Sequence, residues 1–265
     1  MTLEFSVLMV TYDGEDEHRL ERCLQSIESQ TLLPTETVIC LDGKIRDSLL
    51  NVINNYISKI HIKVIQNNKS SLAENLNIGL QNCTYDFIVR CDSDDISLPN
   101  RFEEHINLLR NFEFDVVSAN SIEIYKDKKR IKKIPYGVIK KDLVYRYFRN
   151  PVNHNVCAFK KESIKKFMYP NGRMEDFRLW TFLLNNNFKI YNQDKELLIA
   201  DVNDLGSRRI GEDYRKAEIK LFLLNFKQNN FHGKFLALLA FILRYPLRFK
   251  ISKILLNNIY KLIRN

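Results

Sequence analysis

Three aspartates, Asp92, Asp94 and Asp95, stand together in the segment "RCDSDDISLP". They follow an apolar run typical of a buried strand and precede a segment typical of a helix. Alternating carboxylates at a strand end point two oxygen ligands the same way. Such ligands suit a hard divalent cation, Mg²⁺ or Mn²⁺, that also binds phosphate oxygens. In isolation the pattern is more often a solvated acidic loop that caps a helix, so the elements around it decide its meaning.

The first hundred residues predict those elements. Four short apolar runs, rich in Val, Ile and Phe, alternate with stretches in which Leu and Ile recur at helical spacing. Strands and helices in strict alternation indicate an α/β fold with a mostly parallel sheet covered by helices on both faces. The predicted strands are Phe5–Val10, Thr37–Leu41, Ile62–Ile65 and Phe87–Cys91.

Polar residues follow each predicted strand: "TYD", "DGK", "NNKSS" and "DSDD". In an open α/β sheet the ligand site lies at the carboxyl ends of the strands. Four acidic or amide-rich strand ends at one edge therefore predict a binding crevice there.

The chain after Asp95 predicts further helices and strands. A helix begins near Pro99, since proline suits a first helical turn, and no clean linker interrupts the chain before about Leu205. Helices are expected over Lys140–Arg149, over Lys161–Phe167 and around "EDFRLWTFLL". Strands are expected over Val116–Ser121, over Ile131–Ile134 and at "ELLIADV".

Composition and charge limit the class of protein. A chain of 265 residues, 45% hydrophobic, can bury one large core. The net charge of +9 lies at the end: nine of the 41 Lys and Arg follow Glu218, after which no acid occurs, so 32 basic residues balance 32 acids before it. A neutral body gives no indication of a nucleic-acid partner.

Cysteine usage and hydropathy indicate where the protein works. The five cysteines form no CxxC pair and several lie in apolar runs, so we expect core thiols in a reducing compartment rather than disulfides or a zinc site. The first residues lack the order of a signal peptide. The longest nearly apolar stretch, Phe235–Leu243, is about half of what a membrane-spanning helix requires. We expect a cytoplasmic protein.

Six segments in collinear order resemble glycosyltransferase family 2 with the GT-A fold, in the branch of amylovoran, capsule and O-antigen enzymes. They cover about Phe5 to Ile210: "FSVLMVTYDGEDEHRLERCLQSIESQT", "ETVICLDG", "LAENLNIGL", "RCDSDDISLPNRFE", "NPVNHNVCAFKKESI" and "MEDFRLW". The resemblance implies a GT-A domain over 1–210, with a nucleotide-sugar half (1–98) and an acceptor half (99–210). A basic helical region, 211–265, follows.

The resemblance implies donor contacts at the strand ends. Tyr12 stacks on the nucleobase, and Asp42 accepts a hydrogen bond from it, typically from uracil; without the family, Asp42 could equally be a turn residue. Asp92 touches ribose and metal, and Asp94 is the direct ligand of Mn²⁺ or Mg²⁺ on the diphosphate. The implied donor-binding residues are Thr11, Tyr12, Asp42, Asn77, Asp92, Ser93, Arg208 and Arg209.

The family's basic residues near the donor are less clearly matched in this chain. Arg208 and Arg209 in "LGSRRIG" resemble the basic pair of a loop that closes over the diphosphate, a contact that suits guanidinium; a solvated loop pair is the alternative. The third strand-end loop, "NNKSSLAENLN", departs from the family, which often carries glycine and a basic residue there: this chain has Ser70 and Ser71, and Lys69 is the basic residue that could substitute.

On the acceptor side the resemblance implies that Asp176, 82 residues beyond Asp94, is the general base of an inverting transfer. A carboxylate there removes the proton of the attacking hydroxyl. The same acids could simply stabilise the positive end of a helix. Glu175 and Trp180 are expected to shape the acceptor pocket. His154 is expected to contact acceptor or phosphate, although a lone histidine is more often structural.

The basic end of the chain interleaves apolar residues with Lys and Arg. Ile251, Ile254, Leu255, Ile259, Leu262 and Ile263 fall at helical spacing. A basic amphipathic helix binds anionic lipid surfaces, so we expect peripheral attachment to the inner face of the plasma membrane. A helix packed on the catalytic domain or an oligomer contact is the alternative.

These residues predict transfer of a hexose or N-acetylhexosamine from a UDP-sugar to a lipid-linked or oligosaccharide acceptor in bacterial surface polysaccharide synthesis. Two alternatives are a sugar nucleotidyltransferase, which would release pyrophosphate, and a catalytically idle binding or scaffold relative. The sequence names neither the sugar nor the linkage.

Overall fold

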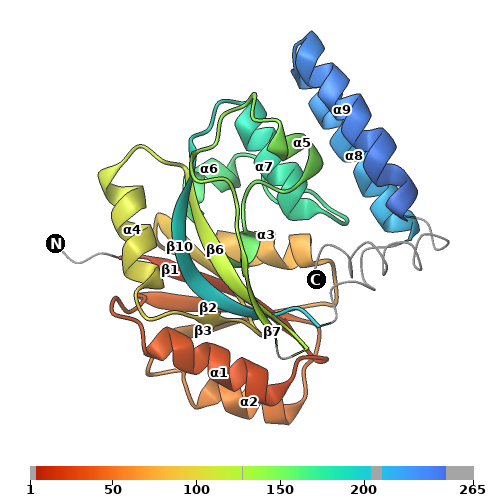
Figure 1. The fold of residues 1–265 in the computed structure, drawn as a ribbon. Coiled ribbons are helices and arrows are strands. Elements are labelled where there is room, and N and C mark those ends of the chain that lie inside the picture. Colours follow the sequence, from red (N-terminus) through yellow and green to blue (C-terminus); the bar gives the residue numbers. More distant parts are fainter. Residues whose placement is uncertain (1–3, 127, 204–210, 249–265) are drawn as a thin grey trace.

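The computed structural model describes residues 4–126, 128–203 and 211–248. In this part of the chain one sheet of ten strands runs through the molecule with helices on both faces (Figure 1). Its first strands pair in parallel in the order β3-β2-β1-β4. They are β1 (Ser6–Tyr12), β2 (Glu36–Asp42), β3 (Ile62–Asn67) and β4 (Phe87–Asp92). The predicted α/β class is confirmed.

The second half of the chain extends this sheet beyond β4. The short strand β9 (Ala158–Lys160) pairs antiparallel with both β4 and β6, and β10 runs parallel to β6. The remaining strands are β5 (Ile96–Ser97), β6 (Val116–Tyr125), β7 (Lys128–Lys132), β8 (Gly137–Val138) and β10 (Ile190–Asp201). Strands β6 and β10 are both longer than the sequence predicted.

Helices cover the two faces in separate groups. The core on one face combines β1 and β2 with α1 (Glu17–Glu28), α2 (Asp47–Asn54) and α4 (Arg101–Asn111). The opposite face is covered by α3 (Leu72–Asn82), α6 (Lys161–Lys165) and α7 (Glu175–Asn185). Gly79 lets α3 approach the sheet closely, since a Cβ there would lie 2.5 Å from Leu8 Cδ1.

The predicted helix over Lys140–Arg149 is wrong for most of its length. Only α5 (Tyr145–Phe148) is helical. Ile139 is buried in the core on the α3, α6 and α7 face of the sheet, and Leu143 packs against it. The spacing of these apolar side chains resembles that of a helix, but the segment that carries them is irregular. The predicted strand at Ile131–Ile134 is shifted: β7 starts at Lys128 and pairs along β6.

Two helices, α8 (Glu212–Gln228) and α9 (Phe231–Arg244), form a hairpin beside α5 and α7 (Figure 1). A single turn of 3₁₀ helix, Tyr245–Arg248, follows α9. Both helices lie within the predicted C-terminal region 211–265, whereas the stripe from Ile251 to Ile263 lies outside the described residues. Within the described ranges no helix has the length and hydropathy to cross a bilayer.

All five cysteines are free and buried, as the sequence predicted. Burial raises the pKa of each thiol, and raises that of Cys83 and of Cys157 to about 12. They act as small apolar core residues.

Candidate active site

Polar strand ends meet at one edge of the sheet. The parallel register places Tyr12 opposite Asp42 and Asp42 opposite Asn67. On the other side of β1, Asp92 lies opposite Val10. The ends of all four parallel strands therefore lie close together, as an open α/β sheet requires of a ligand site.

The turn after β4 brings carboxylates together. Burial, then the charges of Asp92 and Glu15, raise the pKa of Asp94 to about 6. The next residue, Asp95, is buried, and its Oδ2 accepts a hydrogen bond of 2.7 Å from Asn155 Nδ2. Burial and the neighbouring carboxylates Asp92 and Asp94 raise its pKa well above the usual value. Negative charge is concentrated here beyond what nearby cations balance.

Glu15 belongs to this cluster and was not predicted. It is 8% exposed, and its Oε2 accepts a hydrogen bond from the hydroxyl of Ser93. A further bond of 3.0 Å comes from the backbone N–H of Asp16 to Oε1. The predicted donor residue Ser93 is thus buried and holds Glu15. The available signal was an acid in the loop after the first strand, where an open α/β sheet places its ligand site.

Asp92 is paired with Arg90, two residues earlier on the same side of β4. The guanidinium is 1% exposed and the carboxylate is 36% exposed. Burial opposes the charge on Arg90, but the neighbouring carboxylate of Asp92 favours it, and the pKa of Arg90 is raised. The ion pair fixes the orientation of the partly exposed Asp92 carboxylate at the sheet edge.

A second group of polar residues surrounds Asp42. Its Oδ1 accepts a hydrogen bond of 2.7 Å from Ser70 N and one of 2.9 Å from Asn75 Nδ2. Asn75 is fully buried, and its own Oδ1 accepts from Asn67 Nδ2 at 2.8 Å. Asn75 also escaped prediction, although an amide on the buried face of α3 requires partners.

The other predicted donor residues take different positions. Thr11 is buried, and its Oγ1 has no hydrogen-bond partner among the described residues. Tyr12 is 45% exposed, with its ring so close to Gly14 that a Cβ there would lie 2.5 Å from Cε2. Asn77 binds the backbone of Tyr169 in both directions, at 2.9 and 2.8 Å. Arg208 and Arg209 lie outside the described residues.

The predicted base lies at the first turn of α7. Asp176 Oδ2 accepts a hydrogen bond of 2.7 Å from Asn150 Nδ2, and its Oδ1 accepts one of 2.7 Å from Phe177 N. Burial, then the charge of Asp176, raise the pKa of Glu175 to about 7. Met174 precedes the helix in the left-handed region, with φ of 59°. Two acids thus share the positive end of one helix.

His154 packs between aromatic rings near this helix. Its Nε2 shares a hydrogen bond of 3.1 Å with the hydroxyl of Tyr169, and its ring centroid lies 6.0 Å from that of Trp180. Burial, then the charges of Arg90 and Lys132, hold the pKa of His154 well below its usual value. His154 is therefore neutral. Trp180 is fully buried, so it shapes this region from within the core.

Arg90 acts electrostatically on both carboxylate groups. Burial raises the pKa of Asp94 and of Glu175, and Arg90 opposes both shifts. It also affects Tyr169, whose pKa burial raises and Arg90 lowers. The strand-end carboxylates and the helix-start carboxylates thus lie near one buried cation, although 82 residues separate Asp94 from Asp176.

The carboxylate cluster offers two metal-binding oxygens rather than a full protein cage. Among the described residues no group of three or more His, Cys, Asp or Glu side chains is arranged to hold a metal ion. Asp92 and Asp94 nevertheless fit Mg²⁺ or Mn²⁺, which proteins commonly bind through one or two carboxylates together with substrate phosphates.

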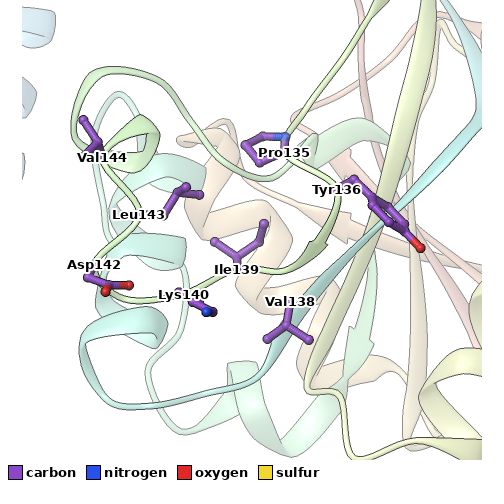
Figure 2. A pocket seen from close by; sticks show the side chains of 8 residues that line it. All are labelled: Pro135, Tyr136, Val138, Ile139, Lys140, Asp142, Leu143 and Val144. Atoms are coloured by element: carbon purple, nitrogen blue, oxygen red, sulfur yellow. The ribbon is translucent and has the colours of Figure 1, made fainter.

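A separate pocket of about 340 Å³ lies between β8 and α5 (Figure 2). Its lining includes none of the predicted site residues: Pro135, Tyr136, Val138, Ile139, Lys140, Asp142, Leu143 and Val144. Mainly apolar and without an acid pair, it lacks the chemistry of the sheet edge.

Sequence comparisons connect this chain with characterised proteins. The family model described as Glycosyl transferase family 2 matches residues 6–168. The amylovoran biosynthesis glycosyltransferase AmsE of Erwinia amylovora is 30% identical over 241 residues, 86% of this chain and 88% of that protein. An Escherichia coli UDP-Gal:alpha-D-GlcNAc-diphosphoundecaprenol beta-1,3-galactosyltransferase is 34% identical over 230 residues, 83% of this chain and 82% of that protein.

Solved structures share the fold at lower identity. Staphylococcus aureus TarS 1-349 in complex with UDP-GlcNAc aligns with a TM-score of 0.71 and 18% identity, over 88% of this chain and 70% of that one. The mannosyltransferase PcManGT of Pyrobaculum calidifontis, in complex with GDP-Man and Mn²⁺, aligns with a TM-score of 0.59 and 15% identity, over 99% of this chain and 81% of that one.

Proposed function

Because this chain belongs to glycosyltransferase family 2 and has the GT-A fold, we propose that it transfers a hexose or N-acetylhexosamine, with inversion, from a UDP-sugar to a lipid-diphosphate-linked glycan. Its family places it among glycosyltransferases of bacterial polysaccharide and lipid-linked glycan synthesis. The relatives' names supply the substrate classes. The observation that carries the proposal is that the buried cation Arg90 acts electrostatically on both the strand-end carboxylate Asp94 and the helix-start carboxylate Glu175.

The strand ends are the donor side of this site. Asp42, fixed by Ser70 N and Asn75, directs a carboxylate oxygen that can accept from the N–H of uracil. The half-exposed ring of Tyr12 offers a stacking surface. UDP in one TarS complex and UDP-GlcNAc in another support a uridine donor.

Asp92 and Asp94 would hold Mn²⁺ or Mg²⁺. When bound, the ion supplies positive charge that stabilises the departing diphosphate. The raised pKa of Asp94 follows first from burial and then from Asp92 and Glu15, so this cluster favours a cation. The presence of Mn²⁺ in the PcManGT complex supports the choice of metal.

Asp176 acts on the acceptor. Its carboxylate accepts the proton of the acceptor hydroxyl while that oxygen forms a bond to the anomeric carbon. The bond from the anomeric carbon to the diphosphate breaks with its electron pair, and UDP leaves. Attack from the face opposite the diphosphate turns an α-linked donor into a β-glycoside. Asn150 holds Asp176 Oδ2 in place, at 2.7 Å.

The protein would work at the inner face of the plasma membrane, where a lipid-diphosphate acceptor is embedded.

Product analysis tests the function. Purified protein is incubated with a panel of UDP-sugars and a GlcNAc-diphosphate-lipid acceptor, and the product linkage is determined by NMR. UDP and a β-linked product support the proposal. Release of pyrophosphate from UTP and a sugar phosphate would instead indicate a nucleotidyltransferase, and binding of UDP-sugar without turnover an idle relative.

A further inference from the structure

Helix α9 carries an apolar stripe on the side that faces away from the domain. Phe231, Phe235, Leu238 and Ile242 recur at intervals of four, three and four residues, the spacing of one helix face. Their exposed fractions are 88%, 57%, 43% and 56%. We call these four residues the outer stripe. The opposite side of α9 is buried through Leu236, Ala237, Ala240 and Gly233.

The hairpin is fastened to the domain by buried polar contacts. Arg146 is fully buried, and its Nη2 donates to Asn185 Oδ1 at 2.7 Å and to Asn225 Oδ1 at 3.2 Å. Arg244 donates to Tyr147 O at 3.1 Å, which ties α9 to α5. Helix α9 is therefore attached to the domain through its opposite side, and this attachment leaves the outer stripe exposed.

The neighbouring helix α8 repeats the pattern. Ile219, Leu223 and Phe226 follow the same spacing and are 39%, 43% and 38% exposed. Lys234 of α9 lies 5.6 Å from the ring centroid of Phe226, and Lys227 next to it is exposed. Apolar side chains and lysines thus alternate across the hairpin, the composition of surfaces that lie in a lipid interface.

Beyond the first turn of α8, which carries Glu212 and Asp213, the hairpin has no exposed acid. Glu218 is the last acid of the chain; it is buried and accepts a hydrogen bond of 2.8 Å from Arg244. From Ile219 to Leu243 the hairpin carries Lys220, Lys227 and Lys234 and no Asp or Glu. This part of its surface is therefore both apolar and basic, which complements a layer of anionic headgroups over acyl chains.

We propose that the outer stripe of α9, with the exposed apolar residues of α8, docks into an anionic lipid surface. Two other occupants fit less well. A second copy would bring two basic surfaces together, and like charges repel. The basic end of this chain would find no acid on the hairpin after Glu218 to pair with.

Docking would also orient the catalytic helix. Asn185 at the end of α7 donates to Gln228 Oε1 of α8 at 3.0 Å, and the Arg244 guanidinium lies 4.8 Å from the Phe177 ring centroid. Since Phe177 follows Asp176 directly, a docked hairpin holds the proposed base at a fixed height above the lipid. This consequence rests on the proposed function, whereas the docking itself does not.

Vesicle co-sedimentation of the full chain without nucleotide tests the docking. The test variant is Phe235→Glu/Ile242→Glu. The matched control, Leu33→Glu/Ile131→Glu, places the same charges at two exposed apolar positions outside the hairpin. With vesicles of phosphatidylcholine and phosphatidylglycerol, we expect wild type and control to pellet. The partition coefficient of the test variant onto these vesicles should be at least about tenfold lower. Phosphatidylcholine alone should bind all three proteins poorly.

Thermal melting of each protein shows that it is folded, and the milder Phe235→Ser/Ile242→Ser variant should give an intermediate loss. The proposal is overturned if the folded test variant pellets like wild type, because the end of the chain would then hold the lipid. It is equally overturned if wild type ignores phosphatidylglycerol vesicles, or if gel filtration shows a dimer that the test variant dissociates while vesicle binding is unchanged. Failure of UDP-sugar turnover would leave this result unaffected.

Discussion

Arg90 and Asp92 form an ion pair at the end of β4 in which the guanidinium is 1% exposed and the carboxylate 36% exposed. Burial raises the pKa of Asp94 and of Glu175, and Arg90 opposes both shifts. One buried cation thus faces more carboxylates than it can neutralise. On the donor side, a bound divalent metal would supply the missing positive charge. On the acceptor side, Asp176 would take up the proton of the acceptor hydroxyl.

Replacing Arg90 tests its part in this arrangement. Arg90→Met leaves the partly exposed Asp92 without its partner, and a hydrogen bond to a charged group contributes about 1.5–3 kcal/mol. We expect this loss in the free energy of unfolding from urea titration, together with weaker binding of UDP and Mn²⁺. Arg90→Lys keeps the charge but not the forked geometry, and it should recover part of the stability. Wild-type stability in Arg90→Met would contradict the assignment.

Asp176→Asn tests the proposed base. The amide cannot take the acceptor proton, so the transfer rate should fall by about 10²- to 10⁴-fold. The affinity for UDP, measured by calorimetry, should stay unchanged because the donor contacts lie at the strand ends. Asn150→Ala removes the 2.7 Å hydrogen bond to Asp176 and should give a smaller loss of rate. A fully active Asp176→Asn enzyme would refute the assignment.

Glu175 predicts a pH dependence of stability. Burial and the neighbouring Asp176 raise the pKa of Glu175 from 4.5 to about 7 in the folded protein. Between these values the folded state binds more protons than the unfolded state, so this residue's contribution to stability falls as pH rises. We therefore expect Glu175→Gln to melt at a higher temperature than wild type above pH 7. The difference should vanish below about pH 4.5, and a constant difference from pH 4 to pH 8 would contradict this.

Two asparagines of α3 form a matched pair. Asn75 positions Asp42, whereas Asn77 binds the backbone of Tyr169. Each loss of buried hydrogen bonds should cost about 1–3 kcal/mol in unfolding free energy. We expect Asn75→Ala to weaken UDP binding about tenfold and Asn77→Ala to weaken it less. Equal losses of UDP affinity would support the role in donor binding that the sequence predicted for Asn77.

The sheet edge was predictable because its signal is local. Each parallel strand is a short apolar run that ends in polar residues, and parallel pairing brings such ends together at one edge. "DGK" and "DSDD" could therefore be placed at the same edge of the sheet without contact information, on the two strands that flank β1. The acids Glu175 and Asp176 were instead identified through the resemblance of "MEDFRLW" to the family, and in the structure they occupy the first turn of α7.

The residues that orient these groups were missed because their partners are distant in the chain. Glu15, which was missed, lies 78 positions from its partner Ser93, and Asn150, also missed, lies 26 positions from Asp176. Arg90 was visible as a charge inside the apolar run "FIVRC", but a single charge in a strand does not name its partner. The irregular segment before α5 misled for a related reason, since Ile139 and Leu143 are apolar through tertiary burial rather than helical repetition.

The most direct test of the account measures UDP release from UDP-sugars by wild type and by Asp94→Asn, with Mn²⁺ or with EDTA, in the presence of the lipid-diphosphate acceptor. We predict release by wild type only when Mn²⁺ is present, and a loss of about 10²-fold or more in Asp94→Asn, since this carboxylate would hold the ion that stabilises the leaving diphosphate. Release that is equally fast in EDTA, or that survives intact in Asp94→Asn, would contradict it.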